Sequence, residues 1–139
     1  MRERWLAATL LSGAAFLLVE VRFEHREVLG ETWHGWIPLG CATLLLVLGV
    51  PAWLAWRKGG RKFLIALFAL AAAIGPLGMW FHSDGRPVRA LASIARVWAS
   101  KPGSKGGEKA GSAPPVLAPL AFSGLGLLGV LVCAGARKE

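Results

Sequence analysis

Four long runs of apolar residues dominate the hydrophobic pattern of the chain. They cover positions 5–21, 36–56, 63–81 and 116–136, and only the first contains a charged residue, Glu20. A helix needs about 20 apolar residues to cross the hydrocarbon core of a bilayer, because each residue adds about 1.5 Å. The pattern therefore predicts four membrane-spanning helices, of which the first is the shortest.

A cleaved signal peptide is the alternative for the first run, because Arg2 and Arg4 precede it. Positions 17–22 nevertheless contain no small-x-small pattern, which signal peptidase requires. We therefore expect the first run to be retained as a helix.

An amphipathic segment separates the third and fourth runs. On a helical wheel, positions 88–99 place Val88 and Leu91 on one face and Arg89 and Arg96 on the opposite face. Such a helix typically lies in the plane of the membrane interface. Positions 100–115 are rich in Gly, Ser, Lys and Pro and predict a flexible linker.

The expected fold class is therefore all-α, as an integral membrane four-helix bundle. A short interfacial amphipathic helix lies between its third and fourth helices, and positions 1–139 form a single domain. Composition agrees, since 55% of the 139 residues are hydrophobic and only 17% are charged, against about 25% charged in soluble domains. We expect no nucleic-acid binding despite the net charge of +8, because the membrane spans leave little soluble surface.

Tryptophans lie near the ends of the apolar runs, where they form aromatic belts at the two faces of a membrane. The residues expected at the membrane interface are six such tryptophans, namely Trp5, Trp33, Trp36, Trp53, Trp56 and Trp80, together with Trp98, Arg89 and Arg96 of the amphipathic segment.

Basic residues divide equally between the two sides, eight on each, but those on the side of the termini all lie close to the spans. The positive-inside rule counts such charges most heavily. We therefore expect a multi-pass protein of a bacterial inner membrane with both termini in the cytoplasm.

Small residues within the third and fourth runs mark candidate packing faces, since close backbone approach drives helix association in lipid. These residues are Ala71, Gly75, Gly124, Gly126, Gly129 and Cys133. They either hold the protein's own bundle together or dock other membrane protein subunits, and the sequence leaves both interpretations open.

Acidic residues and histidines gather on one side of the membrane. If positions 20–34 were helical, Glu20, Glu24, Glu27, Glu31 and His34 would share one face. The candidate metal ligands are the three histidines and three of these carboxylates: His25, His34, His82, Glu24, Glu27 and Glu31. A helix break near Gly30 would scatter them, and we favour a solvated or partner-docking acidic loop.

Function follows by elimination, because no catalytic motif and no charge midway along a run occurs in the sequence. We expect a non-catalytic accessory or structural subunit of a larger membrane complex, with the bilayer and other subunits as partners and no cofactor. The alternative is a membrane redox or metal-handling protein that binds a metal ion or haem at the His/Glu cluster. A small transporter ranks third.

Overall fold

Helices form nearly all of the computed structural model, which describes residues 1–26, 28–99 and 118–135. The five α-helices are α1 (Arg2–Glu24), α2 (Trp36–Leu54), α3 (Gly60–His82), α4 (Pro87–Ala99) and α5 (Leu120–Gly135). Three short 3-10 helices also occur: η1 (Val28–Gly30), η2 (Trp33–Gly35) and η3 (Trp56–Lys58). No strand occurs in the described ranges, so the predicted all-α class is confirmed.

Three helical segments are long and apolar enough to cross a membrane. They are α1, the segment Trp33–Leu54 that contains α2, and α3. The first begins three residues earlier and ends three residues later than the predicted span 5–21. Its 23 residues extend about 35 Å, which exceeds the hydrocarbon thickness of about 30 Å. The fold is therefore compatible with a multi-pass membrane protein.

The fourth predicted span is shorter in the described structure than in the sequence. α5 has 16 residues, which extend about 24 Å, whereas the apolar run covers 116–136. Positions 116, 117 and 136 lie outside the described residues, as does the predicted linker 100–115.

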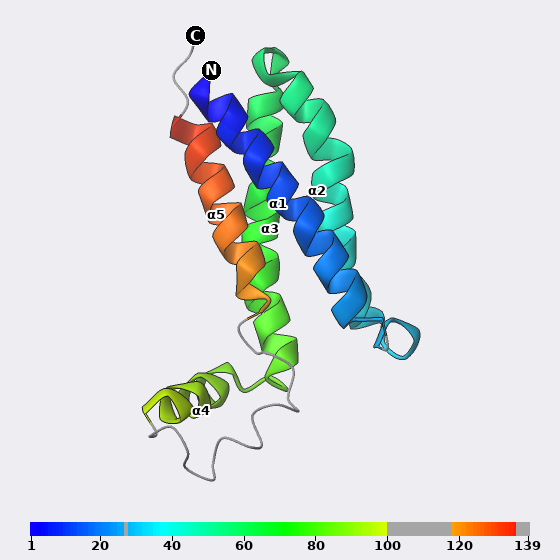
Figure 1. The fold of residues 1–139 in the computed structure, drawn as a ribbon, viewed down its shortest axis with the longest axis vertical. Coiled ribbons are helices and arrows are strands. Elements are labelled where there is room, and N and C mark those ends of the chain that lie inside the picture. The colour runs from blue at the N-terminus through cyan, green and yellow to red at the C-terminus, as the bar shows by residue number, and fades with distance from the viewer. Residues whose placement is uncertain (27, 100–117, 136–139) are drawn as a thin grey trace.

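The four apolar helices α1, α2, α3 and α5 pack side by side, and we call them the helix ring (Figure 1). Each runs antiparallel to its two neighbours, in the order α1, α2, α3, α5 and back to α1. The contact between α3 and α5 is the most extensive. α4 lies apart from the helix ring, beyond the carboxyl end of α3 (Figure 1).

Apolar side chains fill the interior of the helix ring. Phe68 and Leu64 of α3, Leu45 of α2 and Cys133 of α5 are the largest residues that are fully buried. Large apolar side chains also cover the exterior, and Phe16 is 80% exposed. A continuous apolar exterior marks a surface that contacts lipid or another protein.

Glycines shape the turn between α2 and α3. Gly59 has a φ of +94°, in the left-handed region that glycine adopts without strain. Gly60 donates its backbone N–H to the Ala55 carbonyl at 3.1 Å. A Cβ at Gly60 would overlap the Ala52 carbonyl, so the close approach of the two helices requires glycine here.

The acidic stripe that an unbroken helix over positions 20–34 would form does not occur as one helical face. α1 ends at Glu24, and the separate turns η1 and η2 follow it. The backbone N–H of His25 donates to the Val21 carbonyl at 2.9 Å and closes α1. Of the two arrangements that the sequence left open, the helix break is the one observed, because the chain leaves the helical path before Gly30.

Candidate functional site

The three histidines lie at the same end of the helix ring, each in a different segment. His25 directly follows α1, His34 lies in η2, and His82 ends α3. The rings of His25 and His82 meet edge to face with their centroids 5.9 Å apart. His34 instead packs on Phe81, at 4.5 Å, and on Trp33, at 4.0 Å. The structure thus brings His25 and His82 together, and it holds His34 between aromatic rings.

Hydrogen bonding defines the proton position on His25. Its Nδ1 lies 3.1 Å from the Val21 carbonyl oxygen, and because a carbonyl only accepts, Nδ1 donates this bond. In the neutral ring Nε2 is then the acceptor nitrogen. Nδ1 of His82 is buried and has no hydrogen-bond partner among the described residues. A ring nitrogen without a proton can accept a hydrogen bond or bind a cation, and Nε2 of neutral His25 is such an atom.

Carboxylates do not join this histidine pair within the described ranges. Glu20, Glu24 and Glu31 are exposed, and Glu27 lies outside the described residues. No group of three or more His, Cys, Asp or Glu side chains that could hold a metal ion occurs in the described part of the chain. Zinc sites usually take three or four protein ligands. The described residues therefore supply two neighbouring imidazoles and not a complete ligand set.

The small residues singled out in the sequence lie mainly where α3 meets α5. A Cβ at Gly126 would overlap the backbone of Phe68 and Ala72, and one at Gly129 would overlap the Phe68 ring. A Cβ at Gly75 would overlap the Ser123 hydroxyl oxygen and would lie 2.9 Å from the Pro119 carbonyl oxygen. These glycines permit the two helices to approach more closely than any larger residue would allow.

Gly124 differs from the other members of this set. It is exposed, and apart from its chain neighbours and the backbone of its own helix no described atom lies within 4 Å of where its Cβ would be. Ala71 and Cys133 are fully buried. Gly124 therefore faces away from the α3–α5 contact, whereas the remaining small residues lie inside the helix ring.

A hydrogen bond that the sequence analysis did not foresee also joins α3 to α5. Ser123 Oγ donates to the Ala72 carbonyl oxygen at 3.0 Å. In a regular helix this carbonyl accepts from the residue four positions later, which is Pro76 and has no N–H. The Ser123 hydroxyl therefore satisfies the acceptor that Pro76 leaves open. Pro76 in the third apolar run and Ser123 in the fourth were the sequence signals from which this hydrogen bond could have been predicted.

Tryptophans gather at both ends of the helix ring. At the end where α1 begins, the rings of Trp5 and Trp53 lie 5.9 Å apart. The Arg4 guanidinium lies 4.6 Å from the Trp53 ring centroid, and Trp53 Nε1 donates to the Arg4 carbonyl at 2.7 Å. At the opposite end, Trp36 Nε1 donates to the Leu29 carbonyl at 3.0 Å.

The other expected interface residues have varied environments. Trp33, Trp80, Arg89 and Arg96 are exposed and Trp56 is partly exposed, while Trp98 belongs to α4 but its side chain lies outside the description. Arg4 was not among the expected residues, although its position beside Trp5 at the start of the first run was a usable signal.

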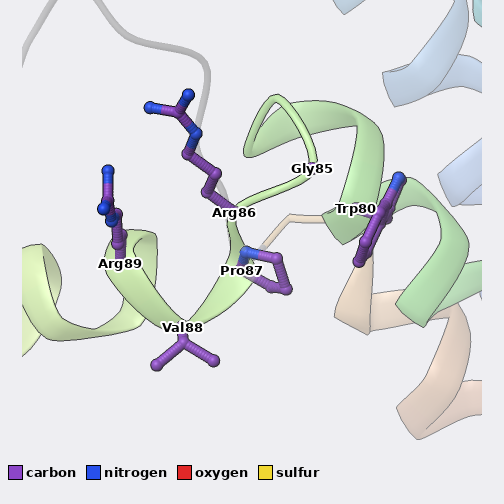
Figure 2. Close-up of a pocket in the computed structure, with 6 residues that line it drawn as sticks. All are labelled: Trp80, Gly85, Arg86, Pro87, Val88 and Arg89. Atoms are coloured by element: carbon purple, nitrogen blue, oxygen red, sulfur yellow. The ribbon is translucent and has the colours of Figure 1, made fainter.

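An open pocket of about 490 Å³ lies where α3 passes into α4 (Figure 2). Its lining combines basic, aromatic and apolar residues: Trp80, Gly85, Arg86, Pro87, Val88 and Arg89. Figure 2 shows the side chains of Arg86 and Arg89 pointing to the same side of the chain, and that of Val88 pointing to the opposite side. Arg86 was not singled out in the sequence, although its spacing of three from Arg89 is typical of residues that share a face.

Comparisons of the chain with known proteins found no match. No protein-family model, curated protein or solved structure matches the chain. The assignment of a function therefore rests on the residues and contacts described above.

Proposed function

We propose that the chain is a four-span integral membrane protein that acts as a non-catalytic structural or accessory subunit of a larger membrane complex. The observation that supports this most is the filled apolar interior of the helix ring, where Phe68, Leu64 and Leu45 are fully buried. Transport across a membrane typically uses ionisable residues or broken helices at mid-depth. A close-packed apolar interior instead favours a rigid structural element.

A stripe of small residues on the outside of α3 supports the docking of another subunit. Ala66, Ala69 and Ala73 recur at helical spacing and are all exposed. Small side chains let the backbone of a second helix approach closely, which favours association in lipid. This outward stripe is distinct from the glycines that already pack α3 against α5.

The sidedness that we propose places both termini in the cytoplasm of a bacterial inner membrane. The turn between α2 and α3 supports it, because Arg57, Lys58, Arg61 and Lys62 lie within a few residues of two spans. Short loops that carry such charges remain preferentially on the cytoplasmic side.

Co-purification tests the proposed role. The full chain, with an affinity tag, is extracted from its native membranes in a mild detergent and separated by size-exclusion chromatography. We expect a second polypeptide to co-elute in a fixed ratio. The variant Ala69→Leu/Ala73→Leu is expected to lose this polypeptide, whereas Ala134→Leu, an exposed alanine on α5, retains it. Elution of the unmodified chain by itself would overturn the subunit role.

A membrane metal-handling protein is the second candidate, and the approach of His25 to His82 is the observation that favours it. Elemental analysis and a visible spectrum of the same purified sample separate the two functions. One transition-metal atom per chain, lost in His25→Ala/His82→Ala, would replace the structural role with the metal-handling one. A metal-free sample that retains the partner polypeptide supports the structural role.

A further inference from the structure

The helix α4 presents an uncovered amphipathic surface. It lies apart from the helix ring (Figure 1), and its apolar residues Val88 and Leu91 are 78% and 44% exposed. Arg89 and Arg96 are exposed as well. Within the described residues, no other helix packs extensively on α4. Such a helix is stable where its apolar face enters a membrane interface and its basic face remains among the headgroups.

The charge of this surface is of one sign. Arg86, Arg89 and Arg96 lie between positions 86 and 99, which contain no acidic residue. The nearest carboxylate in the sequence is Asp84, which is exposed in the preceding turn. Neither Arg86 nor Arg89 forms an ion pair with any residue that the structure describes. Their positive charge is therefore available to an anionic partner.

We propose that the pocket at the α3–α4 turn binds the phosphate of an anionic phospholipid, with Arg86 and Arg89 as its ligands. Two guanidinium groups on one side of the chain (Figure 2) suit a phosphodiester, because each guanidinium can donate two parallel hydrogen bonds. The proposal rests on the membrane location given under the proposed function.

The position of the pocket, near the end of α3, and the residues that line it agree with this ligand. Trp80 lies within three residues of the end of α3 and is exposed at the pocket, where an indole ring would lie at the level of lipid headgroups. Val88 points to the side opposite the arginines (Figure 2). The volume of about 490 Å³ falls in the range of roughly 300–1,000 Å³ that is common for small-ligand sites.

Native mass spectrometry of the detergent-solubilised full chain tests the proposal. The probes are short-chain phosphatidylglycerol, short-chain phosphatidylcholine and inorganic phosphate, each titrated separately. We expect phosphatidylglycerol to bind in preference to phosphatidylcholine. The variant Arg86→Gln/Arg89→Gln should bind phosphatidylglycerol roughly tenfold more weakly, because each basic residue near an anionic lipid surface contributes several-fold in affinity.

Two further variants provide the controls. Lys58→Gln/Lys62→Gln removes the same charge from the opposite end of α3 and should bind phosphatidylglycerol as the unmodified chain does. Arg86→Lys/Arg89→Lys keeps the charge but removes the paired guanidinium donors, so its affinity for phosphatidylglycerol should lie between those of the unmodified chain and the Arg86→Gln/Arg89→Gln variant. Equal loss in both Gln variants, or equal binding of the two lipids, would overturn the proposal. Inorganic phosphate that binds as tightly as phosphatidylglycerol would identify a free anion as the ligand and would also overturn it.

Carbonate extraction of membranes separates failure of this inference from failure of the proposed function. If the unmodified chain is released by carbonate, the membrane location itself is wrong. If it resists extraction but shows no lipid preference, only the lipid site is wrong. The Gln variants should also resist extraction, because all the substituted side chains are on the surface or partly exposed.

Discussion

Gly124 and Gly126 lie two positions apart on α5 and meet opposite surroundings. A Cβ at Gly126 would overlap the α3 backbone, whereas one at Gly124 would meet no other residue. We expect Gly126→Ala to lower the free energy of unfolding by about 1–3 kcal/mol, since overpacking shifts both backbones. Titration with SDS in mixed micelles, with circular dichroism as the readout, measures this free energy of unfolding.

The variant Gly124→Ala is the matched control for that prediction. We expect its stability to remain unchanged or to rise by up to about 1 kcal/mol, because alanine favours helix over glycine. Equal destabilisation by both substitutions would show that the effect arises from the α5 helix itself. The α3–α5 contact would then not explain it.

Ser123 and Pro76 act together across α3 and α5, so their substitutions should not be additive. Ser123→Ala leaves the Ala72 carbonyl without a donor, and we expect a loss of about 0.6–1.7 kcal/mol, the range of interhelical hydrogen bonds in membranes. Pro76→Ala restores an N–H that reaches this carbonyl within α3. In that background Ser123→Ala should cost less than half as much, as a double-mutant cycle would show.

A second serine serves as the control for this cycle. The Ser12 hydroxyl donates to the Ala8 carbonyl of its own helix at 3.1 Å, so Ser12→Ala breaks no contact between helices. We expect almost no change in stability. Additive effects of the Ser123 and Pro76 substitutions would contradict the compensation described here.

At the scale of single residues, the small residues in the sequence predicted packing faces but not which residues these faces contact. The favoured interpretation of an acidic loop required no approach of the histidines to one another, whereas the structure places the ring centroids of His25 and His82 5.9 Å apart. The bond from Ser123 to Ala72 joins residues 51 positions apart. Such a pairing depends on which helix faces lie opposite each other, and hydrophobic periodicity within one helix carries no information about that.

Among the helices, α4 should be the one whose backbone opens most readily. It packs extensively on no other helix in the described structure, and local opening requires little energy where few contacts break. We expect amide hydrogens of α4 to exchange faster than those of α3 in micelles of a zwitterionic detergent, as measured by mass spectrometry. Protection of α4 equal to that of α3 would contradict its separation from the helix ring.

At the scale of helices, apolar run length and amphipathic spacing predicted the elements well. The segment expected at 88–99 corresponds to α4, which Pro87 begins with a φ that suits a first helical position. Mainly charged residues at the ends of α1 continue its helix by three residues on each side. Hydropathy does not detect these turns, because helical hydrogen bonding continues past the last apolar residue. The helix break that the sequence analysis places near Gly30 comes earlier in the structure, after Glu24.

For the whole molecule, the proposed crossing of a membrane by α3 would determine the sidedness of every other segment. Arg61 lies at its beginning and His82 at its end. Reporter fusions after Arg61 and after Glu139 should give a cytoplasmic signal, and a fusion after Gly107 an external one, because the proposed sidedness keeps the basic turn between α2 and α3 inside. The same signal at Arg61 and Gly107 would contradict a crossing by α3.

The chain segments that connect the helices of the helix ring differ greatly in length, and these lengths influence the order in which the helices pack together. Five residues join α2 to α3, whereas 37 residues separate α3 from α5. The entropy lost on closing a loop grows with its length, and α5 is also synthesised last. α2 and α3 should therefore pair as an early hairpin. The most extensive helix contact among the described residues is then the last to form. In the proposed membrane location, the Phe68 surface of α3 would face lipid until α5 covers it.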